Sequence, residues 1–202
     1  MSRLVLIPAA GAGSRFAKAG IRTPKPLIQV QGQSLLEHTL ASFVFEEGDH
    51  LMLAVQRGHS IRETIGSHLA KTYPQIHLHW FELDQLLPGQ LATSAAAVEA
   101  LLQKQPQCRD LSLLIHNCDT GFQWSTALGQ VDGCASMPVF EAEGDHWSFG
   151  QPDPQNPMRA IAIAEKRRIS NLASIGLYGF RSAGEFLDRA RQQLNDGTTV
   201  NG

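Results

Sequence analysis

The first thirty residues constrain the fold more than any other stretch of the chain. The apolar run at residues 4–7 predicts a buried strand, and the small residues Ala9, Ala10, Gly11 and Gly13 predict a loop whose backbone can approach a ligand closely. A helix that begins near Ser14 would direct its unpaired N–H groups and the positive end of its dipole into this loop. Arg15 adds a fork of donors and Lys25 adds a point charge, so this stretch predicts a phosphate site.

Two better-known glycine-rich motifs do not fit this loop. A Walker A loop ends in Gly-Lys-Ser/Thr, whereas this chain has Gly13-Ser14-Arg15. A dinucleotide fingerprint needs a third small residue, where this chain has Phe16, and an acidic residue roughly twenty positions later, where residues 27–33 carry none. What remains is a strand, Gly-Ala-Gly-Ser-Arg, a spacer and then Pro-Lys-Pro-Leu at residues 24–27. The plain alternative is a glycine turn with basic residues on the surface.

Composition limits the classes of protein that the chain can belong to. Its 202 residues and 43% hydrophobic content suit one globular domain with a substantial core. The net charge of -2 argues against nucleic acid as the main partner. The first apolar run is too short for a membrane span and has no cleavage pattern after it, which predicts a cytoplasmic protein without a membrane partner. Cys108, Cys118 and Cys134 are odd in number and predict reduced thiols.

Strands alternate with helices through the first 115 residues, which is typical of a parallel sheet covered on both faces. After the first strand, apolar runs predict strands at residues 51–55, 76–81 and 111–115. Helices are predicted after Ser34 and Ser60, each with a glutamate three residues later as in a capping box, and from about Thr93 to Lys104. His77 and His79 alternate along one strand, and a solvent-facing strand is favoured there over half of a metal site.

The second half of the chain has a different character. Short strands are predicted at residues 135–140, 147–151, 159–164 and 175–180, with the plainest turn at residues 152–157. A last helix is predicted from Ser182, capped with Glu185, to about Leu194. We expect this half to add antiparallel or mixed strands and to form the wall of a second pocket.

Asp119 is the next candidate for chemistry. It comes just past the strand at residues 111–115, as the glycine loop comes just past the first strand, and ligands of open α/β sheets bind at the carboxyl ends of the strands. A carboxylate there could hold Mg²⁺, which usually needs one or two carboxylates plus substrate phosphates. A helix or turn cap is the alternative role for such an aspartate.

In their order and spacing, these motifs resemble the bacterial sugar-phosphate nucleotidyltransferases, which join a nucleoside triphosphate to a sugar 1-phosphate for surface polysaccharides. The resemblance covers residues 7 to about 186. It implies an α/β fold, a Rossmann-like three-layer sandwich with a mostly parallel mixed sheet, and Mg²⁺ as the cofactor. It also implies that Arg15 and Lys25 are catalytic and that Asp119 is the metal aspartate.

The resemblance also implies two sets of binding residues. Nucleotide contacts would come from the two loops that precede helices, at Ala9, Ala10, Gly11, Gly13, Ser14, Gly89, Gln90 and Thr93. Sugar-phosphate contacts would come from the second half, where Glu-Lys, Ser-Asn and Gly-x-Tyr-x-Phe follow in the family's order, at Gly150, Glu165, Lys166 and Asn171. The plain alternatives are an ordinary helix cap at the Gly89 loop and a solvated Glu165–Lys166 pair.

Two departures from the family pattern keep alternatives open. The usual Gly-Thr-Ala appears as Gly-Gln-Leu-Ala-Thr at residues 89–93, so the base and the sugar are not predicted. Relatives continue past the position of Gly202 with a segment that supplies a second metal carboxylate, so residues 1–202 are expected to be one nucleotidyltransferase domain without that segment. The alternatives are transfer to phosphocholine, a sugar alcohol phosphate or a molybdenum cofactor, or a non-catalytic nucleotide-binding protein. A homo-oligomer also stays open.

Overall fold

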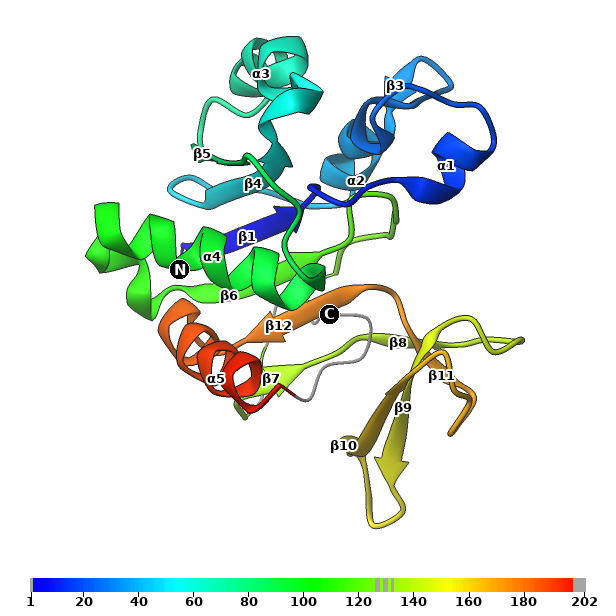
Figure 1. Ribbon diagram of the computed structural model, residues 1–202. Coiled ribbons are helices and arrows are strands. Elements are labelled where there is room, and N and C mark those ends of the chain that lie inside the picture. The colour runs from blue at the N-terminus through cyan, green and yellow to red at the C-terminus, as the bar shows by residue number, and fades with distance from the viewer. Residues whose placement is uncertain (1, 126–127, 129–130, 132, 198–202) are drawn as a thin grey trace.

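The computed structural model describes residues 2–125, 128, 131 and 133–197, and its centre is a six-stranded sheet (Figure 1). The strand order is β5-β4-β1-β6-β12-β7. Four strands are parallel to one another: β1 (Arg3–Pro8), β4 (His50–Gln56), β5 (His77–Leu83) and β6 (Ser112–His116). The other two, β12 (Leu177–Phe180) and β7 (Ala135–Ser136), are antiparallel to their neighbours. The mostly parallel mixed sheet confirms the fold class predicted from the sequence.

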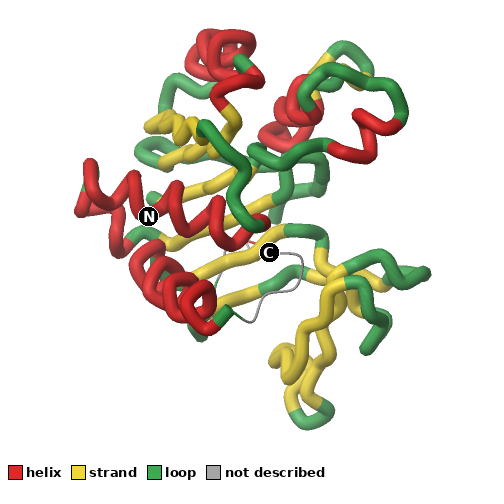
Figure 2. The backbone as a smooth tube through the Cα atoms, viewed as in Figure 1, coloured by secondary structure: helices red, strands yellow, loops and turns green. Residues whose placement is uncertain are grey.

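Helices cover both faces of this sheet, as Figure 2 shows. Leu4 and Leu6 of β1 pack into one core cluster with α4 (Gly89–Lys104) and α5 (Ala183–Asp196). Val5 and Ile7 point to the opposite face and pack with α2 (Leu35–Ala41) and α3 (Ile61–Thr72). Successive side chains of a strand point to opposite faces, so an uninterrupted apolar run builds two cores at once. None of the described helices is both long enough and apolar enough to cross a membrane.

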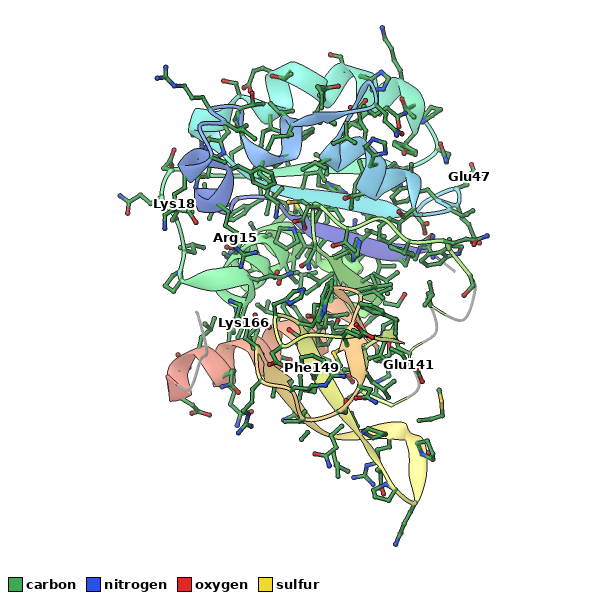
Figure 3. The ribbon with its side chains drawn as sticks, turned by 90° about the vertical axis from the view of Figure 1, so that its right-hand side faces the viewer. Arg15, Lys18, Glu47, Glu141, Phe149 and Lys166 are labelled. Carbon is green, nitrogen blue, oxygen red and sulfur yellow. The ribbon has the colours of Figure 1, made fainter. Side chains whose placement is uncertain are left out.

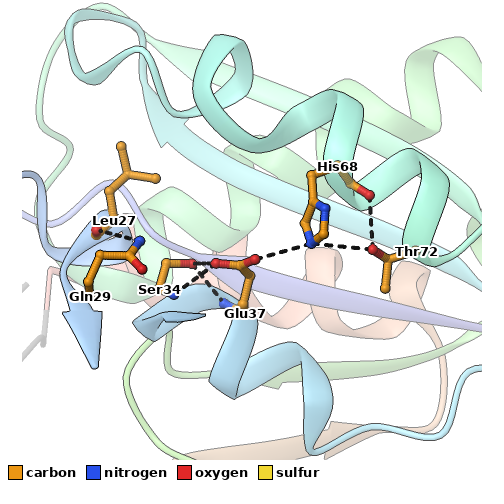
Figure 4. A network of polar contacts seen from close by, with 6 residues as sticks. All are labelled: Leu27, Gln29, Ser34, Glu37, His68 and Thr72. Atoms are coloured by element: carbon orange, nitrogen blue, oxygen red, sulfur yellow. Dashed lines mark hydrogen bonds and ion pairs between the residues drawn. The ribbon is translucent and has the colours of Figure 1, made fainter. Parts of the chain in front are cut away.

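The helix caps follow the sequence signals with one exception. Ser34 and Glu37 form the predicted capping box, and the Nε2 of His68 in α3 lies 3.2 Å from Oε1 of Glu37, which links α3 to α2 (Figure 4). Ser182 accepts the N–H of Glu185 at 3.1 Å, as predicted. The predicted cap at Ser60 is wrong: this residue has φ 48° and its side chain makes no hydrogen bond to the helix end. A left-handed backbone there directs the hydroxyl away from the first turn.

The second half forms a smaller sheet with the order β10-β9-β11-β8, which projects at the lower right of Figure 1. Its strands are β8 (Val139–Glu141), β9 (Ser148–Asp153), β10 (Asn156–Glu165) and β11 (Leu172–Ser174). The predicted strand at residues 135–140 is divided between the two sheets, and β11 was not predicted. The predicted turn at residues 152–157 is shorter, because β9 and β10 continue to Asp153 and from Asn156.

Short elements complete the chain. The 3-10 helices are η1 (Lys25–Leu27), η2 (Arg57–His59) and η3 (Pro106–Asp110), and β2 (Gln29–Val30) pairs with β3 (Gln33–Ser34).

The predicted solvent-facing strand at His77 and His79 is wrong for His79. His77 is exposed, but His79 is half-buried, and its Nε2 lies 2.9 Å from Nδ1 of His50 on β4. The two rings are stacked, with centroids 5.1 Å apart. Burial, with the neighbouring His50 and His77, lowers the pKa of His79 to about 4. The core beside α4 extends to this end of the sheet, which period-two alternation alone does not reveal.

Candidate active site

The first candidate site lies at the carboxyl ends of β1 and β6. The chain runs from β1 outward to β4 and β5, then returns to place β6 on the other side of β1. Ligands of open α/β sheets bind at such a reversal of strand order. A pocket of about 700 Å³, called here the first pocket, opens at this point. Its lining includes all eight predicted nucleotide contacts, together with Arg15, Lys25 and Asp119.

The glycine loop ends in a very short helix. Gly13 has φ 58° and precedes α1 (Ser14–Lys18), which starts where the sequence predicted. With five residues, α1 has too few aligned peptide units for the strong dipole that the sequence interpretation assigned to it. The donors in the first pocket are therefore the N–H groups of the loop and the side chains of Arg15 and Lys25.

Lys25 and Asp119 meet inside the first pocket. The Nζ of Lys25 in η1 lies 2.5 Å from Oδ2 of Asp119, with 25% and 35% of the side chains exposed. The two residues are distant in the sequence, and the reversal of strand order brings their loops together. In the absence of a phosphate ligand, the lysine and the aspartate neutralise each other.

The residues of the first pocket fit a magnesium ion that substrate phosphates help to hold. Asp119 is the one carboxylate among the described residues that line this pocket. The described part of the chain has no group of three or more histidine, cysteine, aspartate or glutamate side chains arranged for a metal. Mg²⁺ keeps several waters and commonly takes one or two carboxylates plus substrate phosphates. Asp119 alone suits that arrangement and does not suit a metal cage built only from protein.

A second pocket of about 450 Å³ adjoins the first. Gln90 and Asn117 line both pockets, and Nε2 of Gln90 donates to Oδ1 of Asn117 at 3.3 Å. We call this pair the seam. Gly176 packs directly on the seam and has φ +77°. A Cβ at this position would lie 2.3 Å from Nδ2 of Asn117, so only glycine fits there. The two pockets therefore meet at a polar wall whose shape depends on a glycine.

The predicted sugar-phosphate residues divide into two groups. Glu165 lines the second pocket, whereas Lys166 lines neither pocket, although its Nζ lies 3.5 Å from Oε1 of Glu165. Gly150 and Asn171 line neither pocket: a Cβ at Gly150 would meet Met137 at 2.8 Å, and Oδ1 of Asn171 accepts from Arg168 at 2.8 Å. Figure 3 shows Arg15 beside the glycine loop and Lys166 at the end of β10, and both residues lie on the same side of the view.

Sequence reasoning missed several side chains of the second pocket and the residue beneath it. His116 is fully buried, and its Nδ1 and Nε2 each lie 2.8 Å from a backbone carbonyl oxygen, of Gly176 and Thr120 respectively. It thereby ties together two loops of the second pocket. Burial, as the largest effect, lowers the pKa of His116. The only signal in the sequence was the position of His116 and Asn117 at the end of an apolar strand.

Comparison with known proteins points to the same class as the geometry. No model of a known protein family matches the chain. A curated 2-C-methyl-D-erythritol 4-phosphate cytidylyltransferase from Neisseria meningitidis is 35% identical over 75 residues, which is 37% of this chain and 30% of that protein. The sequence match thus spans less than a third of this relative.

Solved structures match over most of the chain. The nucleoside-diphosphate-sugar pyrophosphorylase from Vibrio cholerae has a TM-score of 0.77 and 28% identity, covering 94% of this chain and 78% of that one. The UDP-glucose pyrophosphorylase from Acinetobacter baumanii has a TM-score of 0.67 and 18% identity, covering 99% and 85%. The inositol-1-phosphate CTP transferase from T. maritima has a TM-score of 0.66 and 14% identity, covering 89% and 70%.

The structural neighbours of this chain are therefore nucleoside-diphosphate-sugar pyrophosphorylases and related cytidylyl- and uridylyltransferases. This confirms the resemblance that the motifs predicted, and it supports an enzyme of the nucleotidyltransferase kind.

Proposed function

We propose that the chain transfers a nucleotidyl group from a nucleoside triphosphate to a sugar 1-phosphate, or to a closely similar phosphorylated acceptor, and releases pyrophosphate. The observation that carries this proposal is the pair of adjoining pockets. The first has a glycine loop, two cationic side chains and a carboxylate, and the second has Glu165 with several polar side chains. Two substrates that exchange a phosphoryl-linked group must meet at such a boundary.

The proposed reaction is a direct displacement. A phosphate oxygen of the acceptor forms a bond to the α-phosphorus of the triphosphate, the bond from that phosphorus to the bridging oxygen breaks, and pyrophosphate leaves with the electron pair. No bond to the protein is required, so catalysis consists of positioning and charge stabilisation. The seam pair would keep the two reacting phosphates within reach of each other, since Gln90 and Asn117 border both pockets.

Each charged residue of the first pocket has a proposed role. Arg15 would bind the leaving pyrophosphate through its fork of donors. Lys25 would exchange Asp119 for the α-phosphate, which frees the carboxylate for a cation. Mg²⁺ bound at Asp119 would neutralise phosphate charge when substrate is present. We also keep as proposals a role for Gly150 and Asn171 in acceptor binding and a cytoplasmic location.

Pyrophosphate release tests the proposal. The four ribonucleoside triphosphates and dTTP are each combined, in the presence of Mg²⁺, with a panel of sugar 1-phosphates, phosphocholine and inositol phosphate. Release that needs one triphosphate and one acceptor supports the proposal and identifies both substrates. Binding of a triphosphate without release for any acceptor contradicts it and favours the non-catalytic alternative. The variant Asp119→Asn should lose the part of the pyrophosphate release that depends on Mg²⁺.

A further inference from the structure

The second pocket combines aromatic rings with a single negative charge. Glu165 is the only carboxylate among the described residues that line it, and neither lysine nor arginine belongs to that lining. Four aromatic side chains line the same pocket: Phe140, His146, Trp147 and Tyr178. The faces of the phenylalanine, tryptophan and tyrosine rings are electron-rich and attract cations within about 6 Å. The interior therefore disfavours an anionic group and suits a cationic one.

Three of these rings, those of Phe140, His146 and Trp147, are packed against one another. Phe140 meets Trp147 edge to face, with centroids 5.3 Å apart and an interplanar angle of 87°. His146 lies 4.8 Å from Trp147, centroid to centroid. The indole Nε1 of Trp147 donates to the carbonyl oxygen of Glu143 at 3.1 Å, which fixes the orientation of the ring. A fixed ring loses little freedom when a ligand binds.

Glu165 is held beside Trp147 by the base of the β9–β10 hairpin. Glu165 is the direct partner of Ser148 across the two strands, and the Ser148 hydroxyl donates to the Glu165 carboxylate. The N–H of Lys166 donates to the carbonyl oxygen of Trp147 at 2.9 Å. The carboxylate of Glu165 and the indole of Trp147 both line the second pocket, so one ligand there can contact both.

The charge of Glu165 is balanced only by Lys166 in the absence of a ligand. The Nζ of Lys166 lies 3.5 Å from Oε1 of Glu165, and no other ion pair of Glu165 occurs among the described residues. We keep for Lys166 the role that the sequence resemblance implies, which is to bind the phosphate of the acceptor. The ammonium group of Lys166 cannot pair fully with both the Glu165 carboxylate and the acceptor phosphate. When Lys166 binds the phosphate, Glu165 therefore loses its counter-ion.

We infer that the acceptor is zwitterionic: besides its phosphate it carries an ammonium group, and Glu165 with Trp147 binds that ammonium. Phosphate binding moves Lys166 from Glu165 to the ligand, and the ammonium of the ligand replaces it. This inference rests on the proposed function. An amino sugar 1-phosphate and a phosphorylated amino alcohol both supply this chemistry, and the test separates them.

Matched acceptor pairs give the test. Glucosamine 1-phosphate is compared with glucose 1-phosphate, and phosphocholine with dimethylbutyl phosphate, in which carbon replaces the quaternary nitrogen. We expect kcat/KM for pyrophosphate release to favour the ammonium member of one pair about 10-fold or more, and the pair that responds identifies the source. Equal or better turnover of both neutral members overturns the inference and leaves the proposed function intact. No release with any acceptor overturns both.

Variants at two residues of the second pocket, Glu165 and Trp147, locate the effect, with Glu141 as the control. Glu165→Gln keeps the shape and hydrogen bonding of the side chain but removes its charge, so the preference for ammonium should fall to about 1 while the KM of the triphosphate stays unchanged. Glu141→Gln, an exposed carboxylate on β8 outside the pocket, should keep the preference. Trp147→Leu should lower the preference by about 2- to 30-fold, and Trp147→Phe should restore part of it. A Glu165→Gln protein with its full preference contradicts the inference.

Discussion

The two halves of this molecule differ in how their strands are buried. Leu6 in β1 is 0% exposed, with helices over both faces, whereas Ile163 in β10 is 63% exposed. The first half supplies a rigid floor for the first pocket, and the second half supplies a thin sheet whose side chains line the second. The comparison teaches that the residues proposed to carry the reaction lie on a doubly covered sheet, while the proposed acceptor contacts lie on a sheet with little core of its own.

The largest expected effect tests whether the small sheet has an independent core. Phe149 is 0% exposed, and Phe149→Ala should cost about 3–5 kcal/mol of local stability, whereas Leu6→Ala should cost about 2–5 kcal/mol of global stability. Phe149→Ala should therefore weaken acceptor binding and leave triphosphate binding nearly unchanged. Leu6→Ala should lower the midpoint of denaturant unfolding by the same amount for every spectroscopic probe. Equal loss of triphosphate binding in the two proteins would mean that the halves unfold as one unit.

The next prediction concerns the two cationic side chains of the first pocket. Arg15→Ala and Lys25→Ala should each reduce kcat by about 100- to 1,000-fold, because they remove charge from the proposed transition state. Circular dichroism and the thermal midpoint should stay close to those of the unmodified protein. Lys18→Ala, at the other end of α1 and outside the lining of the first pocket, is the matched control and should keep normal turnover. Near-normal turnover of both test variants would contradict the assignment.

Acid should lower the stability of the first half through the half-buried His79. His79 has a pKa of about 4 in the folded chain, and its ordinary value is near 6.5, so the unfolded chain binds more protons between these values. Stability is fully present above about pH 6.5 and is lost as the pH falls toward about 4. A shift of this size is worth roughly 3 kcal/mol for a fully buried group, and we expect about half of that for the half-buried His79.

Urea denaturation at about pH 7 and about pH 5 measures this loss. His79→Gln should show a smaller fall in its midpoint than the unmodified protein. His146→Gln, which changes an exposed histidine, should show the full fall. The groups that face His79 or its neighbour His50 are His77, Cys108 and Asp49. Identical falls in all three proteins would assign the acid sensitivity to another group.

The smallest predicted effect concerns a single cap. Ser34→Ala removes the side-chain acceptor for the N–H of Glu37 and should cost about 1 kcal/mol, because the first turn of α2 then has an unpaired donor. Removal of this hydroxyl should also raise the pKa of Glu37, since the Ser34 hydrogen bond is the main cause of its lowered value. Thermal unfolding and carboxylate titration by NMR measure the two effects. Turnover should not change.

The first half was predictable because a doubly covered parallel strand consists of one apolar run. The strand at residues 111–115 was found as β6 at Ser112–His116, and α4 begins at Gly89 rather than near Thr93 because the Pro-Gly pair was interpreted as a loop. In the folded chain, the Thr93 hydroxyl donates to the Gly89 carbonyl oxygen within that first turn. A Pro-Gly pair looks the same in a sequence whether it precedes a helix or starts one.

The second half was less predictable because exposed strands need no regular alternation. Only Ala164 of β10 is buried, and β11 has three residues, too few for any period to show. The meeting of Lys25 with Asp119 could be anticipated, since the carboxyl ends of neighbouring parallel strands share an edge. Asn117 and Trp147 could not, because their positions depend on the turn at Gly176 and on the register of the hairpin.

If the two pockets bind the two substrates as proposed, the seam between Gln90 and Asn117 also makes the two binding events interdependent. A ligand in either pocket that moves this amide pair changes the shape that the other ligand meets. Thermodynamic reciprocity then requires that each ligand changes the affinity of the other by the same factor. A hydrogen bond of 3.3 Å between two side chains would thereby carry the coupling between the two pockets.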